Sequence, residues 1–231
     1  PAYIRAACEA SLKRLGVERI GLYYCHRRDP QVPLEDMVGT LADLVREGKV
    51  AAIGLSEVSA ASLRTAHAVH PIAAVQSEYS LWERGAEAEV LPTTRELGVA
   101  FVAYSPLGRS FLTNQPPAAD TLEPGDFRLA LPRFQGEAGV ANLALQQALA
   151  ELAQSLGQPV VAIALAWLLQ RQPHVLPIPG TRRLGHLQQN LAACSLVLPD
   201  AVMAQLDAMF APGSVAGARY PDAGWAGVET R

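Results

Sequence analysis

Residues 20–29, Ile-Gly-Leu-Tyr-Tyr-Cys-His-Arg-Arg-Asp, contain the side chain in this sequence that is best suited to chemistry. A short apolar and aromatic run ends there in His26, which three charged residues follow. This pattern is typical of a buried strand whose last residue emerges at the mouth of a parallel barrel, where catalytic groups lie. A neutral imidazole at a strand end can donate a hydrogen bond to a developing alkoxide. His26 is therefore our leading active-site candidate; the alternative is a histidine that only ends a strand.

Two other arrangements of reactive side chains are less favoured. Cys25 precedes His26 directly, but adjacent strand residues point to opposite faces, so the two cannot pair. We expect Cys25 to pack against the surrounding helices. His67 and His70 lie near the end of a predicted helix, where no carboxylate or cysteine is placed to complete a metal site. We therefore predict no metal site.

Five apolar runs of strand length are separated by helical patterns. The predicted strands are 20–26, 50–55, 72–75, 99–103 and 174–178. The predicted helices are 2–15, 34–47, 59–67, one that closes at 97–98, 140–156, 159–170, 183–193 and 199–210. Gly16 should end the first helix, Ser59 should cap the third, and Pro92 should lie in the first turn of the fourth or kink it. Strands separated by single helices predict an α/β fold with a parallel sheet.

Two stretches break this alternation. Residues 106–138 contain several prolines and isolated charges and show no hydrophobic period. A loop of this length is usually a lid, a binding loop or disordered, and we treat it as a long, lid-like loop. The tail from Pro212 is rich in glycine and alanine, so we expect it to lie on the surface.

Composition limits the class of protein. The 231 residues, half of them apolar and with a formal net charge of −3, fit a single domain that spans residues 1–231. Charges of both signs are scattered along the chain, which argues against nucleic acid or a membrane surface as a partner. The three cysteines are far apart and indicate a reducing compartment, and no apolar run has the length of a membrane span. We therefore expect a cytoplasmic protein.

Taken side by side, the strand ends resemble those of the aldo-keto reductase family. The similar segments are Leu-Tyr-Tyr-Cys-His-Arg, Ile-Gly-Leu-Ser-Glu-Val-Ser, Val-Gln-Ser-Glu-Tyr-Ser-Leu-Trp, Ala-Tyr-Ser-Pro-Leu-Gly-Arg and Ile-Pro-Gly-Thr-Arg. They occur in the family's order and spacing. The resemblance implies a (β/α)8 TIM barrel, of which this chain supplies the fourth to the eighth βα units. The absent units, roughly 90 residues, would carry the family's catalytic tyrosine, lysine and aspartate.

The resemblance implies roles for the first four strand ends. His26 matches the active-site histidine that hydrogen-bonds the substrate carbonyl. Ser56, Glu57 and Gln76 match the positions that hold the nicotinamide carboxamide, an amide that needs both a donor and an acceptor. A solvated carboxylate at the rim is an equally good reading of Glu57. Tyr104 matches the aromatic ring that stacks on the nicotinamide, and its alternative is a tyrosine of the barrel core.

The resemblance also implies where the phosphates and the adenosine bind. The loop residues that would contact the pyrophosphate are Ser105, Leu107, Gly108 and Arg109. Gly180, Thr181 and Arg182 precede a helix whose N-terminus favours the 2′-phosphate of the adenosine, so we predict NADPH over NADH. His186, Gln189 and Asn190 lie on that helix, and the last two would face the adenine or the solvent.

The implied function is an oxidoreductase that reduces an aldehyde or ketone by hydride transfer from NADPH. The alternatives are a catalytically inactive fragment and a regulatory subunit on the same fold, such as channel β-subunits. His26 argues against the second alternative because those subunits have asparagine there. No Gly-x-Gly-x-x-Gly opens a helix, which disfavours a Rossmann dehydrogenase. The expected partner is a small carbonyl compound, selected here by the segment around Trp82, Phe111 and Phe127-Arg128. The sequence is compatible with a monomer and with a homo-oligomer.

Overall fold

Amphipathic helices and apolar strands alternate along the chain, as the sequence predicts. The computed structural model describes residues 1–229 and forms two compact units. Of the described residues, unit 1 comprises Pro1–Ser77, Ala86–Val102 and 226–229. Unit 2 comprises Glu78–Gly85 and Ala103–Trp225.

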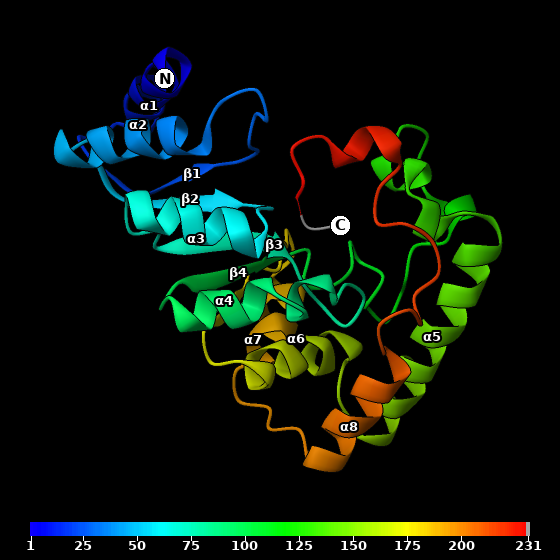
Figure 1. Cartoon of the computed structure of the whole chain (residues 1–231). Helices are drawn as coiled ribbons and strands as arrows, with labels where there is room; N and C mark the ends of the chain where they lie inside the picture. The colour runs from blue at the N-terminus through cyan, green and yellow to red at the C-terminus, as the bar shows by residue number, and fades with distance from the viewer. Residues whose placement is uncertain (230–231) are drawn as a thin grey trace. The chain divides into compact units, whose positions relative to one another are not determined.

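The helices and strands of unit 1 come in regular alternation (Figure 1). They are α1 (Ala2–Leu15), β1 (Ile20–Cys25), α2 (Leu34–Arg46), β2 (Val50–Ser56), α3 (Ala60–Val69) and α4 (Val90–Glu96). Strands β3 (Ala74–Glu78) and β4 (Ala100–Tyr104) begin in unit 1 and end in unit 2. Strand β1 pairs with β2 and β2 with β3, in parallel, with Cys25 opposite Leu55 and Ser56 opposite Gln76.

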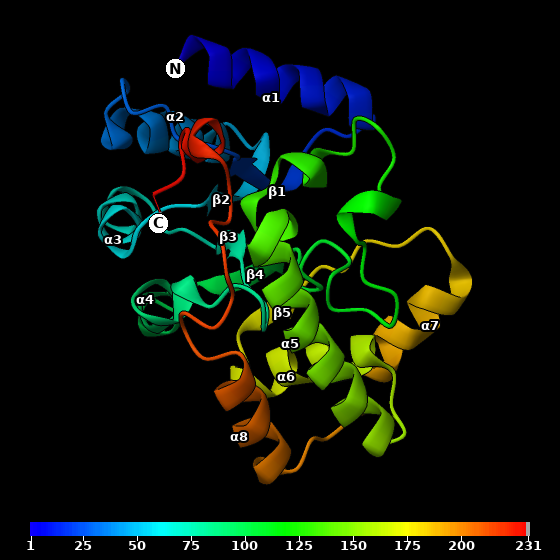
Figure 2. The ribbon, with the colours of Figure 1, turned by 90° about the vertical axis from the view of Figure 1, so that its right-hand side faces the viewer.

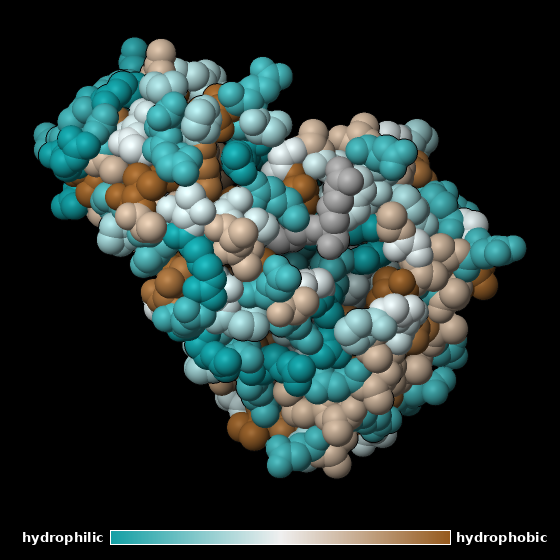
Figure 3. Space-filling view, in the orientation of Figure 1, coloured by the Kyte–Doolittle hydropathy of each residue, from teal (hydrophilic) through white to brown (hydrophobic). Residues whose placement is uncertain are grey.

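Helices α2, α3 and α4 cover one face of the strands of unit 1 (Figure 2). Ile53, Leu55 and Leu63 are fully buried in this layer, because each strand and each helix turns its apolar side toward the other. The outward side of α3 and α4 carries mainly hydrophilic residues (Figure 3), and Arg64 of α3 there forms an ion pair with Glu96 of α4 at 2.5 Å. The apolar face of each helix therefore fixes which side of the sheet it covers.

Unit 2 consists mainly of helices. Its regular elements are α5 (Gly136–Ser155), α6 (Val160–Arg171), β5 (Val175–Pro177), α7 (Leu184–Ala192) and α8 (Asp200–Met209). Every residue from Val160 to Leu168 is buried, as expected of a helix that is apolar on all sides. The backbone N–H of Ile178 donates to the carbonyl of Ala103, which ties the β5 segment to β4. The sheet order is β1-β2-β3-β4-β5, so the described residues hold a five-stranded α/β sheet.

Most sequence-predicted elements are confirmed, with shifted ends. Gly16 ends α1 in a left-handed conformation, Ser59 caps α3 through the backbone N–H of Ser62, and Pro92 lies in the first turn of α4. Strand β3 was expected at 72–75 but runs to Glu78, because polar side chains at a strand end do not interrupt its backbone pairing. Helix α5 begins at Gly136, four residues before the predicted start.

The structure adds detail to two segments that the sequence left irregular, and it corrects the prediction for the second. The 106–138 segment contains short 3₁₀ helices at Ala119–Thr121, Phe127–Ala130 and Pro132–Phe134. The tail from Pro212 is not simply a surface segment, because Arg219 is 5% exposed and Val228 is 7% exposed. Asn142 of α5 anchors the tail by exchanging two hydrogen bonds of 2.9 Å with the backbone of Ala216.

Among residues 1–229, no single helix is both long and apolar enough to cross a bilayer. Only α5 and α6 together pass that test, as a pair bent by 91°.

Candidate functional site

His26, Ser56 and Gln76 lie in one row at the carboxyl ends of three neighbouring strands of unit 1. Ser56 stands opposite Gln76 in the register of β2 and β3. Cys25 stands opposite Leu55, which brings the next residue, His26, level with Ser56. Three polar side chains that are up to 50 positions apart in the sequence are thus collected at one edge of the sheet. This is the arrangement that the strand-end pattern predicted.

The two faces of the strands differ in what they contact. The sulfur of Cys25 lies 3.2 Å from the sulfur of Met37 on α2, so the odd-numbered positions of β1 face the helices. Burial raises the pKa of the Cys25 thiol. The predicted packing of Cys25 against a helix is therefore confirmed. Alternation along a strand would put position 26 on the opposite face, but His26 follows the end of β1 and lines one pocket together with Cys25 and Met37.

Tyr24 and Gly54 stand opposite each other on β1 and β2, two residues before His26 and Ser56. Burial raises the pKa of the Tyr24 phenol, while a hydrogen bond with the Gln76 side chain acts to lower it. The Tyr24 ring lies so close to Gly54 that a Cβ there would sit 2.5 Å from the ring carbon Cε1. Glycine at position 54 thus lets the ring lie against β2 and reach Gln76.

The hydroxyl of Ser56 contacts Arg27, which lies two residues after the end of β1. Nη1 of Arg27 donates to Oγ of Ser56 at 3.0 Å and to the carbonyl of His26 at 2.8 Å. Ser56 is 4% exposed, and its hydroxyl retains a proton that can be donated to a ligand. A hydroxyl and a carboxamide thus lie side by side at these strand ends, and such a pair can offer both a donor and an acceptor.

Glu57 follows Ser56 in a left-handed conformation with φ of 55°. Its backbone N–H donates to the carbonyl of Gln76, and its carbonyl accepts from the N–H of Glu229. The residue is fully buried, so the alternative of a solvated carboxylate at the rim is wrong. A non-glycine residue held at positive φ stores backbone strain, which is common at ligand sites.

Glu229 holds the last described residues of unit 1 against α3. Its carboxylate forms an ion pair with Arg28 at 2.6 Å and accepts from the backbone N–H of Ser59 at 2.9 Å. Burial acts to raise the pKa of Glu229, but hydrogen bonds from Ser62, Ser59 and Arg28 outweigh it and lower that pKa. Residues 226–229 are thus held beside Glu57.

An open pocket of about 560 Å³ lies in unit 1 next to the end of β1. Its wall includes Tyr24, His26 and Arg27 from the β1 region and Met37 from α2. His26 is exposed to solvent and so is accessible to a ligand.

In unit 2, Tyr104 ends β4, and a loop of unusual backbone conformation follows it. Ser105, Arg109 and Ser110 all have positive φ, between 47° and 76°. Gly108 has φ of 55° and packs on Trp82, with its missing Cβ only 3.3 Å from that side chain. Left-handed backbone of this kind turns amide groups toward a common point and is typical of anion-binding loops. The hydroxyl of Tyr104 lies 2.9 Å from that of Tyr220.

The structure gives the guanidinium of Arg109 a different partner from the predicted pyrophosphate. Nη2 of Arg109 donates to the carboxylate of Glu78 at 2.7 Å, and both side chains are buried, at 9% and 2% exposed. The guanidinium also lies over the rings of Phe127 and Tyr220. Burial raises the pKa of Glu78, although Arg109 and Arg219 oppose that shift. The Arg109 side chain is therefore engaged by Glu78 and by two aromatic rings.

The segment before α7 is exposed, as an anion site requires. Gly180, Thr181 and Arg182 are all accessible to solvent, and the hydroxyl of Thr181 accepts from the backbone N–H of Arg183, the residue that caps the helix. On the helix itself, His186 and Gln189 are exposed, whereas Asn190 is 8% exposed. Exposure of Gln189 is compatible with either predicted role, whereas burial of Asn190 contradicts its alternative as a solvent-facing residue.

The cluster that Tyr220 joins was not predicted from the sequence. Arg219, Tyr220 and Trp225 lie in the tail that we expected on the surface, and Glu78 had no assigned role. The available signal was an Arg-Tyr pair and a tryptophan among small residues, since large aromatic side chains in a Gly/Ala-rich stretch usually pack.

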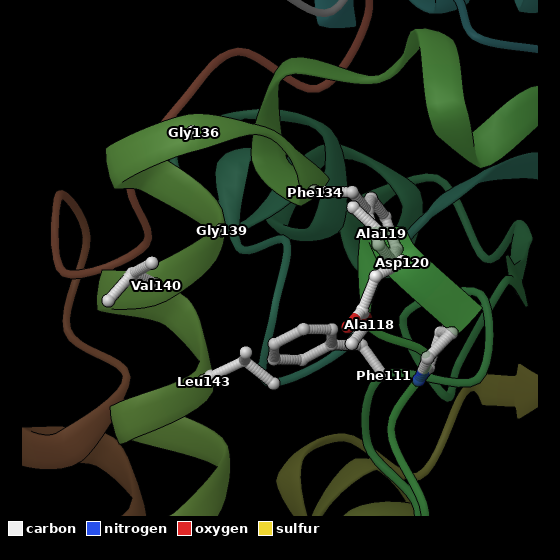
Figure 4. Close-up of a pocket in the computed structure, with 10 residues that line it drawn as sticks. Phe111, Ala118, Ala119, Asp120, Phe134, Gly136, Gly139, Val140 and Leu143 are labelled. Carbon is white, nitrogen blue, oxygen red and sulfur yellow. The ribbon is translucent and has the colours of Figure 1, made fainter. Parts of the chain in front are cut away.

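A smaller pocket of about 230 Å³ lies in unit 2 beside the amino end of α5 (Figure 4). Phe111 and Leu143 lie side by side along it, and Val140 of α5 is also one of its lining residues. The Phe111 ring also packs on Trp82, with centroids 3.7 Å apart. Two of the residues predicted to select the substrate, Trp82 and Phe111, are therefore neighbours.

Within residues 1–229, no group of three or more metal-binding side chains comes together. Nδ1 of His67 accepts from the backbone N–H of Ile72, and Nδ1 of His70 lies 2.9 Å from the carbonyl of Pro71. Each of these rings thus has a backbone partner.

Comparison with known proteins gives a consistent set of matches. The sequence profile described as Aldo/keto reductase family matches residues 1–211. A glycerol dehydrogenase from Gluconobacter oxydans is 30% identical, with a TM-score of 0.84 over 94% of this chain and 66% of its own. A thermostable aldo-keto reductase in complex with the inhibitor epalrestat is 30% identical, with a TM-score of 0.71 over 89% of this chain and 65% of its own.

A third similar structure is an aldo/keto reductase from Klebsiella pneumoniae in complex with NADP and acetate. It is 28% identical, with a TM-score of 0.71 over 96% of this chain and 69% of its own. The chain thus spans about two thirds of the length of each of these structures.

Proposed function

Because this chain belongs to the aldo/keto reductase family, we propose that it binds NADPH and serves the reduction of an aldehyde or ketone to an alcohol. When bound, NADPH supplies the hydride for such a reduction. His26 orients the carbonyl by donating a hydrogen bond to its oxygen. We assign no described residue to the roles of the family's catalytic tyrosine, lysine and aspartate.

The donor set fits the cofactor. Ser56 and Gln76 supply the hydroxyl and the amide that complement a carboxamide. Tyr104 offers an aromatic ring at the end of β4, and the left-handed loop that follows offers backbone amides to the pyrophosphate. Arg182, exposed before α7, suits the 2′-phosphate, which is why we propose NADPH rather than NADH.

One observation carries the proposal: His26, Ser56 and Gln76 form a polar row at the strand ends of a chain that matches this family over residues 1–211. The structure in complex with NADP, at 28% identity, supports the choice of cofactor. All three cysteines are free, which is in keeping with the reducing, cytoplasmic compartment that we propose.

A titration with both nucleotides tests the proposal. We expect the fluorescence of bound NADPH to show saturable binding that is tighter than the binding of NADH. Arg182→Ala should weaken NADPH about 10- to 100-fold, as expected for the loss of a hydrogen bond to a charged group, and leave NADH nearly unchanged. Arg14→Ala, an exposed arginine on α1, is the matched control and should change neither. Equal affinities for the two nucleotides, or no binding, would contradict the proposal.

A further inference from the structure

A buried charged cluster in unit 2 brings the tail onto the loop that follows β4. The carboxylate of Glu78 receives Nη2 of Arg109 at 2.7 Å and lies 3.4 Å from Nε of Arg219. All three side chains are less than 10% exposed. Charges this well buried persist only when they are paired, so the cluster holds its members in fixed positions.

Tyr220 is the residue that this cluster surrounds. The guanidinium carbon of Arg109 lies 4.7 Å from the centroid of its ring, and that of Arg219 lies 4.9 Å from it. Trp225 meets the same ring edge-on, with centroids 5.5 Å apart. Gly224 packs against the side chain closely enough that a Cβ there would sit 2.8 Å from the Cβ of Tyr220. The ring is therefore confined on several sides.

The polar end of that confined ring meets Tyr104. The two phenol oxygens are 2.9 Å apart, a normal hydrogen-bond distance. The phenol oxygen lies on the axis of the second side-chain torsion, so fixing it restrains the first torsion and the direction in which the ring extends. A phenol O–H also prefers to lie in the plane of its ring, so the hydrogen bond favours one ring plane as well.

We propose that Tyr220 is a positioning residue, whose hydroxyl holds the ring of Tyr104 in the orientation on which the nicotinamide stacks. The inference rests on the proposed function, because it takes Tyr104 to be the cofactor-stacking residue. Tyr220 itself acts through Tyr104. The Glu78 cluster sets the position of Tyr220, so the tail segment 219–225 determines how well the aromatic platform is ordered before the cofactor arrives.

A double-mutant cycle on the full chain tests this. Tyr220→Phe and Tyr104→Phe each remove one hydroxyl and keep the ring. Each should weaken NADPH binding about three- to tenfold, and the double variant should bind no more weakly than either single variant. Tyr3→Phe, at a side chain that is 84% exposed, is the matched control and should have no effect.

The outcomes separate the two proposals. If wild type binds NADPH but the effects of the two substitutions are additive, the positioning role is wrong while the proposed function stands. If wild type does not bind NADPH, the proposed function fails.

A measurement without cofactor then decides the positioning role on its own. In spectra of ring-¹³C-labelled tyrosine, Tyr220→Phe should shift and broaden the Tyr104 signals, while the melting temperature falls by no more than a few degrees. Unaltered Tyr104 signals would overturn the inference.

Discussion

Adding one methyl group at Gly54 tests the packing that supports the polar row. In Gly54→Ala, the new Cβ would lie 2.5 Å from Cε1 and 2.6 Å from Cδ1 of Tyr24, whereas ordinary contact begins at 3.4 Å. The Tyr24 ring must therefore move by close to 1 Å. Because Tyr24 hydrogen-bonds Gln76, the same movement strains that contact.

The magnitude follows from two terms. Overpacking a well-filled site costs about 1–3 kcal/mol, and a lost hydrogen bond costs about 0.5–1.5 kcal/mol. Replacing glycine also stabilises the folded state by about 0.4–1 kcal/mol, because it restricts the unfolded chain. Gly21 provides a control for this last term, since it also lies in a strand and a Cβ there would meet nothing within 4 Å. Gly54→Ala should therefore be less stable than Gly21→Ala by about 2–4 kcal/mol.

Urea unfolding of the two variants measures this difference directly. The midpoint should fall for Gly54→Ala, with an unchanged slope, and stay level or rise for Gly21→Ala. Free energies of unfolding that agree within about 0.5 kcal/mol would show that the Tyr24 ring does not press on β2 as described.

Three further substitutions test separate parts of the structure. Ser59→Ala removes the cap of α3 and should lower the free energy of unfolding by about 1 kcal/mol in a urea titration. Burial raises the pKa of Glu78 in the folded state, so above pH 4.5, the ordinary pKa of a glutamate, the folded chain binds a proton that the unfolded chain has lost. The free energy of unfolding of wild type relative to Glu78→Gln should therefore fall as pH rises above about 4.5. A difference in free energy that does not change with pH would refute this. Hydrogen bonds from Arg128 lower the pKa of Asp126 to about 2, so the stability of wild type relative to Asp126→Asn should be lost as pH falls from about 4 to about 2, as thermal unfolding at each pH would show.

The strand ends could be predicted because local chemistry determines them. An apolar run that stops at His26 or at Ser56 signals both the strand and the edge where it ends, and parallel pairing then brings such ends together. Gly16 and Ser59 could be assigned as helix ends for a similar reason, since a cap depends on its own backbone and the adjacent turn.

The cluster around Tyr220 could not be predicted in the same way. Glu78 and Arg109 are 31 residues apart, and Tyr104 and Tyr220 are 116 apart, with no shared period to connect them. A tail of small residues has the composition of a surface segment, because the residues that bury its few large side chains are distant in the sequence. The interpretation of Arg109 was incomplete for the same reason, because its buried partner belongs to a different strand end.

A crystal structure of the chain with NADP⁺ tests the central claim most directly. We expect the nicotinamide ring to lie on Tyr104, its carboxamide to bond Ser56 and Gln76, and the imidazole of His26 to face the reacting carbon. Density for the dinucleotide away from these strand ends, or an imidazole turned from it, would contradict the account.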